Sequence, residues 1–553
     1  MVKEDYFEWS KEELIREITK LKKRKKFGMV WEDKPEEVAE LCKTKLPVII
    51  EDKEKAISTD PEKPVNIFIE GDNYHALSVL NYTHKGAIDV IYIDPPYNTG
   101  ARDWKYNNNY VDNNDAWRHS KWLSLIEKRL VLSKRLLKKD GVIIIAIDDN
   151  EVHRLRVLID ELMLGYATTS VTVVHNPRGN ITNNFARTHE YALFIIPNGA
   201  HVIARTKKMN DKPRKFRRWG HNSTRAARPT MFYPVYVKDG QITRIGETPE
   251  PDFHPKSKNV IKENGEIEVW PVDQDGVERR WNFGHDTVNN ELERMVAVEV
   301  KGEFDIFLTQ EDSTPKTVWT DSEFEAGRNG ATLVKTITGL DFPFPKSLYN
   351  VKRCLELIIG NRPNATVLDF FAGSGTTGHA VLELNKDGGK RKFILCTNNE
   401  SNIASEICYP RVANVINGYK DQKGNKIEGL GGNLRYFKTA FVDAEATDMN
   451  KRKLVDNSTE MLCVKEACFD NVESTEYFKI FKNSEDKYIG IIYDDDGISP
   501  FIDELKKTQK KFVVYVFSLD DSAREEEFEE VKDLVELKAI PAVILNIYKR
   551  IFK

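Results

Sequence analysis

The sequence predicts an α/β fold in which a doubly wound, mostly parallel sheet is split by an insert and followed by a small C-terminal α/β domain. Strand-length apolar runs alternate with helical patterns over residues 65–175 and again over 348–396. Such alternation is typical of a parallel sheet with helices on both faces. The alternation fails over 197–338, where Pro, Gly and Trp are scattered, and this failure predicts an inserted domain.

The first half of the sheet is expected between residues 65 and 196. Short apolar runs bounded by turn residues indicate its strands, and longer patterns with helical spacing indicate its helices. The expected strands are 65–70, 88–93, 141–147 and 171–175, and the expected helices are 73–80, 116–137 and 151–162.

The second half of the sheet is expected over 339–440, and the small α/β domain over 441–553. In the second half, helices are predicted at 348–359 and 377–384 and strands at 366–371 and 392–396. In the C-terminal domain, strands are predicted at 488–493, 512–517 and 542–547 and helices at 502–507 and 523–535. The N-terminal segment, 1–64, is expected to begin with a helix, because Ser10 and Glu13 form a capping-box pattern.

Composition excludes several classes of protein. The six cysteines are scattered without a CxxC pair, so neither a zinc ribbon nor a disulfide framework is expected. The charged N-terminus lacks the apolar stretch of a secretory signal, and no apolar run approaches the ~18 residues that a membrane span needs. We therefore expect a cytoplasmic protein without membrane contact.

The sequence Asp94-Pro95-Pro96-Tyr97 follows the apolar run 88–93. A carboxylate and a backbone carbonyl aimed by the fixed φ of proline can accept the two N–H bonds of an aromatic amine. Tyr97 can stack on the face of the same base, which must leave a duplex to reach such a pocket. A plain surface turn is the alternative. The position at the end of a buried strand, where ligand sites of α/β sheets lie, favours the functional interpretation.

A glycine loop, Phe371-Ala372-Gly373-Ser374-Gly375, lies between a predicted strand and a predicted helix. Its glycines permit a tight turn with close approach of a ligand, and a carboxylate could sit at the helix N-terminus near Thr376 and Thr377. A glycine turn used for packing alone is the alternative. The loop has no GK[ST] sequence, so ATP binding is not expected. Glu400 follows the next strand, where an acid can bind ribose hydroxyls.

These motifs resemble those of DNA amino-methyltransferases that use S-adenosylmethionine. Because the Asp-Pro-Pro-Tyr motif precedes the glycine loop, the chain resembles the β-group of adenine-N6 methyltransferases, and within it the modification (Mod) subunits of type III restriction–modification systems. The resemblance rests on Ile69-Glu70-Gly71-Asp72-Asn73-Tyr74-His75-Ala76-Leu77, Ile91-Tyr92-Ile93-Asp94-Pro95-Pro96-Tyr97-Asn98-Thr99-Gly100, residues 141–151 and Asp369-Phe370-Phe371-Ala372-Gly373-Ser374-Gly375-Thr376-Thr377.

The resemblance implies specific roles for these residues. Asp369, Phe371, Gly373 and Gly375 would line the methionine side of the cofactor. Asp72 and Asn73 would meet its adenine, and Lys346 falls where the family places a residue near the methionine carboxylate. Glu400 is the best candidate for the ribose contact.

The insert is the expected target-recognition domain. Residues 201–230 hold ten lysines and arginines against one aspartate, a local charge of +9. Such a stretch can neutralise phosphates and read guanine edges. A solvated loop would be the simpler interpretation if the stretch were not placed between two halves of a DNA methyltransferase. The candidate DNA contacts are Lys212, Arg214, Lys215, Arg217, Arg218, Arg225 and Arg228.

The expected function is therefore methyl transfer from S-adenosylmethionine to adenine N6 at a specific sequence of double-stranded DNA, with no metal and no covalent enzyme intermediate. The resemblance also implies a homodimer and a separate restriction subunit. Three alternatives stay open: methylation of cytosine N4, methylation of RNA or of a protein amide, and a non-catalytic, cofactor-binding DNA-recognition subunit. By family habit, Asp instead of Ser at position 94 favours adenine.

Overall fold

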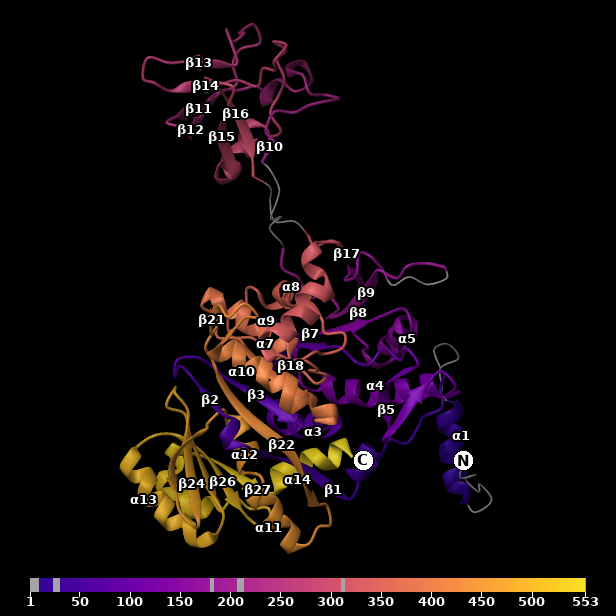
Figure 1. The fold of residues 1–553 in the computed structure, drawn as a ribbon. Helices are drawn as coiled ribbons and strands as arrows, with labels where there is room; N and C mark the ends of the chain where they lie inside the picture. The colour runs from indigo at the N-terminus through magenta and orange to yellow at the C-terminus, as the bar shows by residue number, and fades with distance from the viewer. Residues whose placement is uncertain (1–8, 23–29, 180–183, 206–212, 310–313, 553) are drawn as a thin grey trace. The chain divides into compact units, whose positions relative to one another are not determined.

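The structure is a computed structural model that describes residues 9–22, 30–179, 184–205, 213–309 and 314–552. The chain divides into two compact units (Figure 1). One unit comprises Met1–Ala204 and Lys316–Lys553, and the other comprises Arg205–Pro315. The second unit lies within the range expected for the insert. None of the helices in the described ranges is long and apolar enough to cross a membrane.

The first unit is built on an 11-stranded sheet with the order β1-β22-β3-β19-β18-β4-β7-β9-β8-β17, in which β2 also pairs with β22. Its strands are β1 (Lys45–Glu51), β2 (Ile57–Ser58), β3 (Val65–Glu70), β4 (Ile88–Ile93), β7 (Leu137–Ile147), β8 (Tyr166–Val174), β9 (His189–Pro197), β17 (Val318–Trp319), β18 (Thr366–Asp369), β19 (Lys392–Thr397) and β22 (Asn433–Asp443). From β22 to β7 every neighbouring pair is parallel, whereas β1 and β9 run antiparallel to their neighbours. This mixed sheet confirms the predicted α/β class.

Alternation along the central strands fills two cores, one on each face of the sheet. In β4, Ile91 and Ile93 belong to one core, and Val90 and Tyr92 belong to the other. The first core receives side chains from α3 (Asn73–Thr83), α4 (Arg118–Lys134) and α5 (Val152–Leu162). The second receives side chains from α8 (Leu348–Ile359), α9 (Thr376–Leu384) and α10 (Tyr409–Asn417). α7 (Leu333–Thr338) and the hairpin β20 (Gly418–Lys420) and β21 (Lys426–Glu428) accompany this second layer.

The predicted strands 65–70 and 88–93 are confirmed residue for residue as β3 and β4. The predicted helix 116–137 is shorter, because β7 begins at Leu137. The hairpin of β5 (Ala101–Tyr106) and β6 (Asn109–Asp112) was not predicted from the sequence. At the N-terminus, α1 (Lys11–Lys22) begins with the predicted capping box, in which the Glu13 backbone N–H donates to Ser10 Oγ. The short α2 (Glu37–Leu41) follows.

The C-terminal segment forms a five-stranded sheet that packs into the first unit. Its strands are β23 (Asp470–Ser474), β24 (Phe478–Lys482), β25 (Tyr488–Ile492), β26 (Phe512–Phe517) and β27 (Val535–Ile540), and its helices are α11 (Asp448–Asp456), α12 (Thr459–Glu466), α13 (Ile498–Thr508) and α14 (Ala542–Ile551). Leu462 of α12 and Tyr548 of α14 belong to the same core as α3, and the Tyr548 hydroxyl donates to the Pro47 carbonyl.

Two predictions in this segment are wrong. Residues 542–547 form the start of α14 instead of a strand, and 523–535 holds 3₁₀ turns over Glu525–Leu534 instead of an α-helix. The apolar run 542–547 fits either period, and its pattern of burial decides between them. Ile544 and Tyr548 are buried four residues apart, which is a helical spacing. The last strand is β27, immediately before Pro541.

The second unit contains two antiparallel sheets. One has the order β10-β16-β15, with β10 at Arg214–Lys215, β15 at Met295–Val300 and β16 at Glu303–Leu308. The other has the order β12-β11-β14-β13, with β11 at Val235–Lys238, β12 at Gln241–Ile245, β13 at Asn259–Ile261 and β14 at Ile267–Val269. The short α6 (His285–Val288) joins them around a core that includes Phe216, Tyr233 and Trp281.

Candidate active site

The predicted site residues of the first unit gather at one edge of its sheet. β3, β19, β18 and β4 are parallel neighbours, so their carboxyl ends lie together. Asp72 follows β3, Glu400 follows β19, the glycine loop follows β18, and Asp94 follows β4. Ligand sites of α/β sheets form at this edge. The order of the strands therefore brings together motifs that lie far apart in the sequence.

The Asp-Pro-Pro-Tyr loop is held in place by two tryptophans and an asparagine. The Trp122 indole donates to the Pro96 carbonyl at 2.6 Å. Asn98 adopts φ 55° and is fully buried, and its amide donates to Glu151 Oε1 at 2.5 Å and accepts from the Trp104 indole at 3.2 Å. A strained residue held by such a network is characteristic of functional sites. Among the described residues, no backbone N–H donates to the Pro95 carbonyl, and Pro95 itself is buried.

Lys346 lies between two carboxylates beside Tyr97. Its ammonium is 3.1 Å from Asp94 Oδ1 and 2.9 Å from Glu190 Oε2, and it donates to the Tyr97 hydroxyl at 2.5 Å. The Tyr97 hydroxyl in turn donates to Glu190 Oε2 at 3.0 Å. Lys346, which was predicted to lie near the methionine carboxylate, thus contacts Asp94 and Tyr97 of the Asp-Pro-Pro-Tyr loop.

Glu190 is a site residue that the sequence reasoning missed. It lies in β9, is buried, and also accepts a hydrogen bond of 3.4 Å from the Asn350 amide. An acid within the apolar stretch 189–197 was the available signal, because a charged side chain is rarely buried without a partner.

The pKa values of the two acids in this cluster shift in opposite directions. Burial raises the pKa of Asp94, although the neighbouring Lys346 ammonium opposes the increase. Burial also acts on Glu190, but Lys346 and the hydrogen bonds that it and Tyr97 donate outweigh burial, so the pKa of Glu190 is lowered. Burial would lower the pKa of Lys346, but the two carboxylates raise it instead. The cluster therefore holds one fixed negative charge at Glu190 and a fixed positive charge at Lys346.

The glycine loop is shaped by hydrogen bonds within the protein. Asp369 accepts from the Phe371 backbone N–H at 2.9 Å and from the Thr377 hydroxyl at 2.5 Å. Gly373 and Gly375 have φ values of 50° and 76°, which glycine adopts without strain. At Gly373 an added Cβ would lie 3.8 Å from the Phe371 carbonyl oxygen, an ordinary van der Waals contact, so the positive φ and not crowding favours glycine there. Burial raises the pKa of Asp369 to about 7, against the two hydrogen bonds that it accepts.

The remaining predicted cofactor residues have partners of their own. Thr376 accepts a hydrogen bond of 2.8 Å from the buried Arg411, which fixes the start of α9. Asp72 caps α3 by accepting from the Tyr74 backbone N–H at 2.7 Å. Glu400 lies 2.6 Å from Lys105 of β5. Glu400 therefore lies at the carboxyl end of β19 and is paired there with Lys105.

The basic residues of the insert separate into two groups. Arg214, Lys215, Arg218 and Arg228 are exposed. Arg217 is buried beside Asp305 at 3.5 Å, and Arg225 is 3.1 Å from Glu278 and donates to two backbone carbonyls. Lys212 lies outside the described residues.

Comparison with known proteins assigns the chain to a family. Residues 88–407 match the family model described as DNA methylase. The type II methyltransferase M.KpnI of Klebsiella pneumoniae is 31% identical over 414 residues, which cover 68% of this chain and 94% of that protein. The EcoPI Mod subunit of Escherichia phage P1, a type III restriction–modification enzyme, is 28% identical over 404 residues, which cover 64% of this chain.

The Mod relatives are longer than their matching regions. The aligned part of this chain spans 60% of the EcoPI Mod subunit. The StyLTI Mod subunit of Salmonella typhimurium is 27% identical over 391 residues, which cover 63% of this chain and 55% of that protein. The family model spans more than half of the chain and includes both the Asp-Pro-Pro-Tyr loop and the glycine loop. The chain belongs to the DNA methylase family.

Proposed function

We propose that this protein transfers a methyl group from S-adenosylmethionine to N6 of adenine at a specific DNA sequence, as the modification component of a restriction–modification system. The observation that carries the proposal is that the Asp94-Pro95-Pro96-Tyr97 loop and the glycine loop follow neighbouring parallel strands, β4 and β18, at one edge of a DNA-methylase sheet. Similarity to M.KpnI and to Mod subunits supports the restriction–modification context.

The Asp-Pro-Pro-Tyr loop prepares the amine for attack. The lone pair of an aromatic amine is conjugated into its ring, so the nitrogen is a weak nucleophile. Asp94 and the Pro95 carbonyl accept its two N–H bonds and draw the nitrogen towards a tetrahedral geometry. The ring of Tyr97 stacks on the base after the base leaves the duplex. With S-adenosylmethionine bound beside it, the nitrogen would take the methyl group, the sulfonium would leave as a neutral thioether, and the proton released by the nitrogen would pass to its acceptor Asp94 or to water.

The glycine loop fits S-adenosylmethionine. The positive φ values of Gly373 and Gly375, and the absence of a side chain at both positions, allow close approach to the backbone. The start of α9 favours a carboxylate. Asp369 holds the loop, while Asp72, Asn73 and Glu400 border the same edge. When bound there, S-adenosylmethionine supplies an electrophilic methyl group.

The insert provides the sequence-recognition surface in this proposal. The exposed cations Arg214, Lys215, Arg218 and Arg228 contact double-stranded DNA, and Lys212 belongs to the same basic stretch. Arg217 and Arg225 stabilise the insert through their acidic partners. We propose the domain plan expected from the sequence, with the methyltransferase halves at 65–196 and 339–440, the insert at 197–338 and flanking segments at 1–64 and 441–553. The resemblance to Mod subunits further favours a cytoplasmic homodimer that works with a separate restriction subunit.

Methylome sequencing of a host that lacks adenine methylation and expresses this gene tests the proposal. The expected result is N6-methyladenine at one recurrent sequence with the wild type and none with Asp94→Ala. The outcomes that refute it are an unmethylated genome, equal methylation by Asp94→Ala, or N4-methylcytosine in place of N6-methyladenine.

A further inference from the structure

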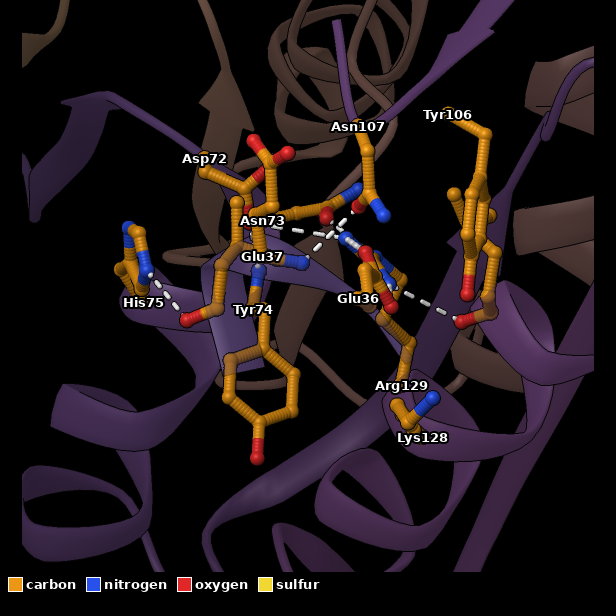
Figure 2. A network of polar contacts seen from close by, with 12 residues as sticks. Glu36, Glu37, Asp72, Asn73, Tyr74, His75, Tyr106, Asn107, Lys128 and Arg129 are labelled. Carbon is orange, nitrogen blue, oxygen red and sulfur yellow. Dashed lines mark hydrogen bonds and ion pairs between the residues drawn. The ribbon is translucent and has the colours of Figure 1, made fainter. Parts of the chain in front are cut away.

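A segment near the N-terminus, residues 34–38, packs beside α3, the helix that follows β3 at the carboxyl edge of the sheet. The backbone carbonyls of Lys34, Pro35 and Val38 each accept a hydrogen bond from the core of the first unit. The donors are the Tyr106 hydroxyl at 2.7 Å, the Asn107 amide at 3.0 Å and the His75 imidazole at 2.9 Å. These contacts hold residues 34–38 against α3 and the β5–β6 hairpin (Figure 2).

This segment presents Glu36 to a buried arginine of α4. Glu36 Oε1 is 2.7 Å from Arg129 Nη2, and Glu36 Oε2 is 3.0 Å from Arg129 Nη1. The two side chains are only 5% and 3% exposed. A buried pair joined by one hydrogen bond and a second close ionic contact fixes the orientation of the guanidinium plane. Residues 34–38 therefore supply an acid to the interior, in addition to covering the surface.

The other side of Arg129 contacts the two residues that border the cofactor edge at α3. Its Nε donates to Asn73 Oδ1, and its Nη2 lies 3.5 Å from Asp72 Oδ1. Figure 2 shows Asp72 and Asn73 beside the Glu36–Arg129 pair. The Asn73 amide donates to the Phe370 carbonyl at 3.0 Å, immediately before the glycine loop. Arg129 thus connects Glu36 with both α3 and the end of β18.

We infer that Glu36 and Arg129 are positioning residues for the cofactor site, and that residues 34–38 are an integral part of that site. This inference rests on the proposed function, because it assigns the adenine side of S-adenosylmethionine to Asp72 and Asn73. Neither Glu36 nor Arg129 needs to touch the ligand. They act by fixing Asn73 against Phe370 and by leaving Asp72 to cap α3.

The charge of Glu36 is the critical element. The Arg129 guanidinium is closer to the Glu36 carboxylate than to the Asp72 carboxylate, so its ionic interaction with Glu36 is the stronger of the two. Without the Glu36 charge, Asp72 remains as the acidic partner of Arg129 among the described residues. The guanidinium would then draw the Asp72 carboxylate away from its capping position. A neutral side chain of the same shape at position 36 should therefore weaken cofactor binding.

The test compares Glu36→Gln with Glu37→Gln in the full-length protein. Glu37 is the adjacent, exposed acid, and its carboxylate contacts Asn108 at 3.2 Å, so its substitution is a matched control. We expect Glu36→Gln to raise the calorimetric Kd for S-adenosylmethionine and its KM by about tenfold, the effect of losing one charged hydrogen bond. The rate at saturating cofactor and the KM for DNA should stay near wild type, as should all parameters of Glu37→Gln.

The double variant Glu36→Leu/Arg129→Met covers the case in which Glu36→Gln does not fold. Replacement of both members of a buried ion pair by apolar residues usually preserves stability. The folded double variant should still show the raised Kd, because Asn73 has lost its arginine. Wild-type affinity in a folded Glu36→Gln or double variant would overturn the inference. A wild-type protein that binds no S-adenosylmethionine would instead refute the proposed function.

Discussion

Two aspartates stand at the carboxyl ends of neighbouring strands of one sheet, yet their surroundings differ. Asp94, after β4, faces the Lys346 ammonium at 3.1 Å, and that ammonium is shared with the buried Glu190. Asp369, at the end of β18, is held by the Thr377 hydroxyl and the Phe371 backbone N–H, which are neutral donors. Burial raises the pKa of both aspartates, and only Asp94 has a cation that directly opposes the increase.

The difference separates two tasks. A carboxylate beside a cation can accept hydrogen bonds from an amine that develops positive charge. A carboxylate held by neutral donors maintains the shape of a backbone loop. In our account Asp94 therefore acts on the reacting amine, whereas Asp369 acts on the geometry of the cofactor loop.

The largest effect should come from Asp94→Asn. The amide keeps the shape of the side chain but loses the charge that attracts the amine, so we expect the methyl-transfer rate to fall by at least about 10²-fold. The Kd for S-adenosylmethionine should be unchanged. Single-turnover transfer to a DNA substrate measures the first quantity and calorimetry the second. A rate within a few-fold of wild type would show that Asp94 does not polarise the amine.

Glu190→Gln should give the next largest effect. Without the Glu190 charge, Lys346 pairs fully with Asp94, and Tyr97 loses its charged acceptor. We expect the rate to fall by about ten- to a hundredfold, the equivalent of one or two charged hydrogen bonds. Addition of Lys346→Met to Glu190→Gln should restore part of the rate, because the competing cation is removed. If the second substitution lowers the rate further, Lys346 does not compete for Asp94.

Asp369→Asn should remove a pH dependence of stability. The pKa of Asp369 is raised to about 7 in the folded protein, whereas an aspartate in an unfolded chain has a pKa of about 4. Between about pH 4 and pH 7 the folded protein therefore keeps a proton that the unfolded chain has already released. This group therefore makes the wild type lose stability as pH rises through that window, and its contribution is constant above it. The difference in Tm between wild type and Asp369→Asn should decrease from pH 5 to pH 7 and then level off. A difference that is independent of pH would contradict the assignment.

Thr377→Val should have the smallest effect. The valine removes one donor to Asp369, so the pKa of Asp369 should rise further and the glycine loop should loosen. We expect the Kd for S-adenosylmethionine to increase by about threefold to tenfold, consistent with one lost hydrogen bond. Thr376→Val is a useful comparison, because the Thr376 hydroxyl contacts Arg411 instead of Asp369.

The sequence predicted those parts of the site that are continuous in the chain. Asp94-Pro95-Pro96-Tyr97 and the glycine loop each combine a strand end, turn residues and reactive groups within a few positions, and the parallel order of the strands then brings them together. The prediction of a strand at 542–547 was wrong, because an apolar run of that length satisfies both the helical and the strand period.

The residues that support the motifs could not be predicted in the same way. Glu190 reaches Lys346 across the sheet, and Glu36 reaches Asn73 only through Arg129, so none of these contacts leaves a local pattern. Their one sequence signal is a charge in an otherwise apolar or unremarkable stretch. That signal becomes specific only after the fold shows which charges are buried together.

The most direct test measures Asp94→Asn and Asp369→Asn side by side, in single-turnover methyl transfer at saturating S-adenosylmethionine together with calorimetric cofactor affinity. We predict that Asp94→Asn keeps the affinity and loses the rate, and that Asp369→Asn loses affinity and recovers most of the rate once the cofactor saturates. The opposite pattern, or equal losses of rate and affinity in both variants, would contradict the division of tasks between the two aspartates.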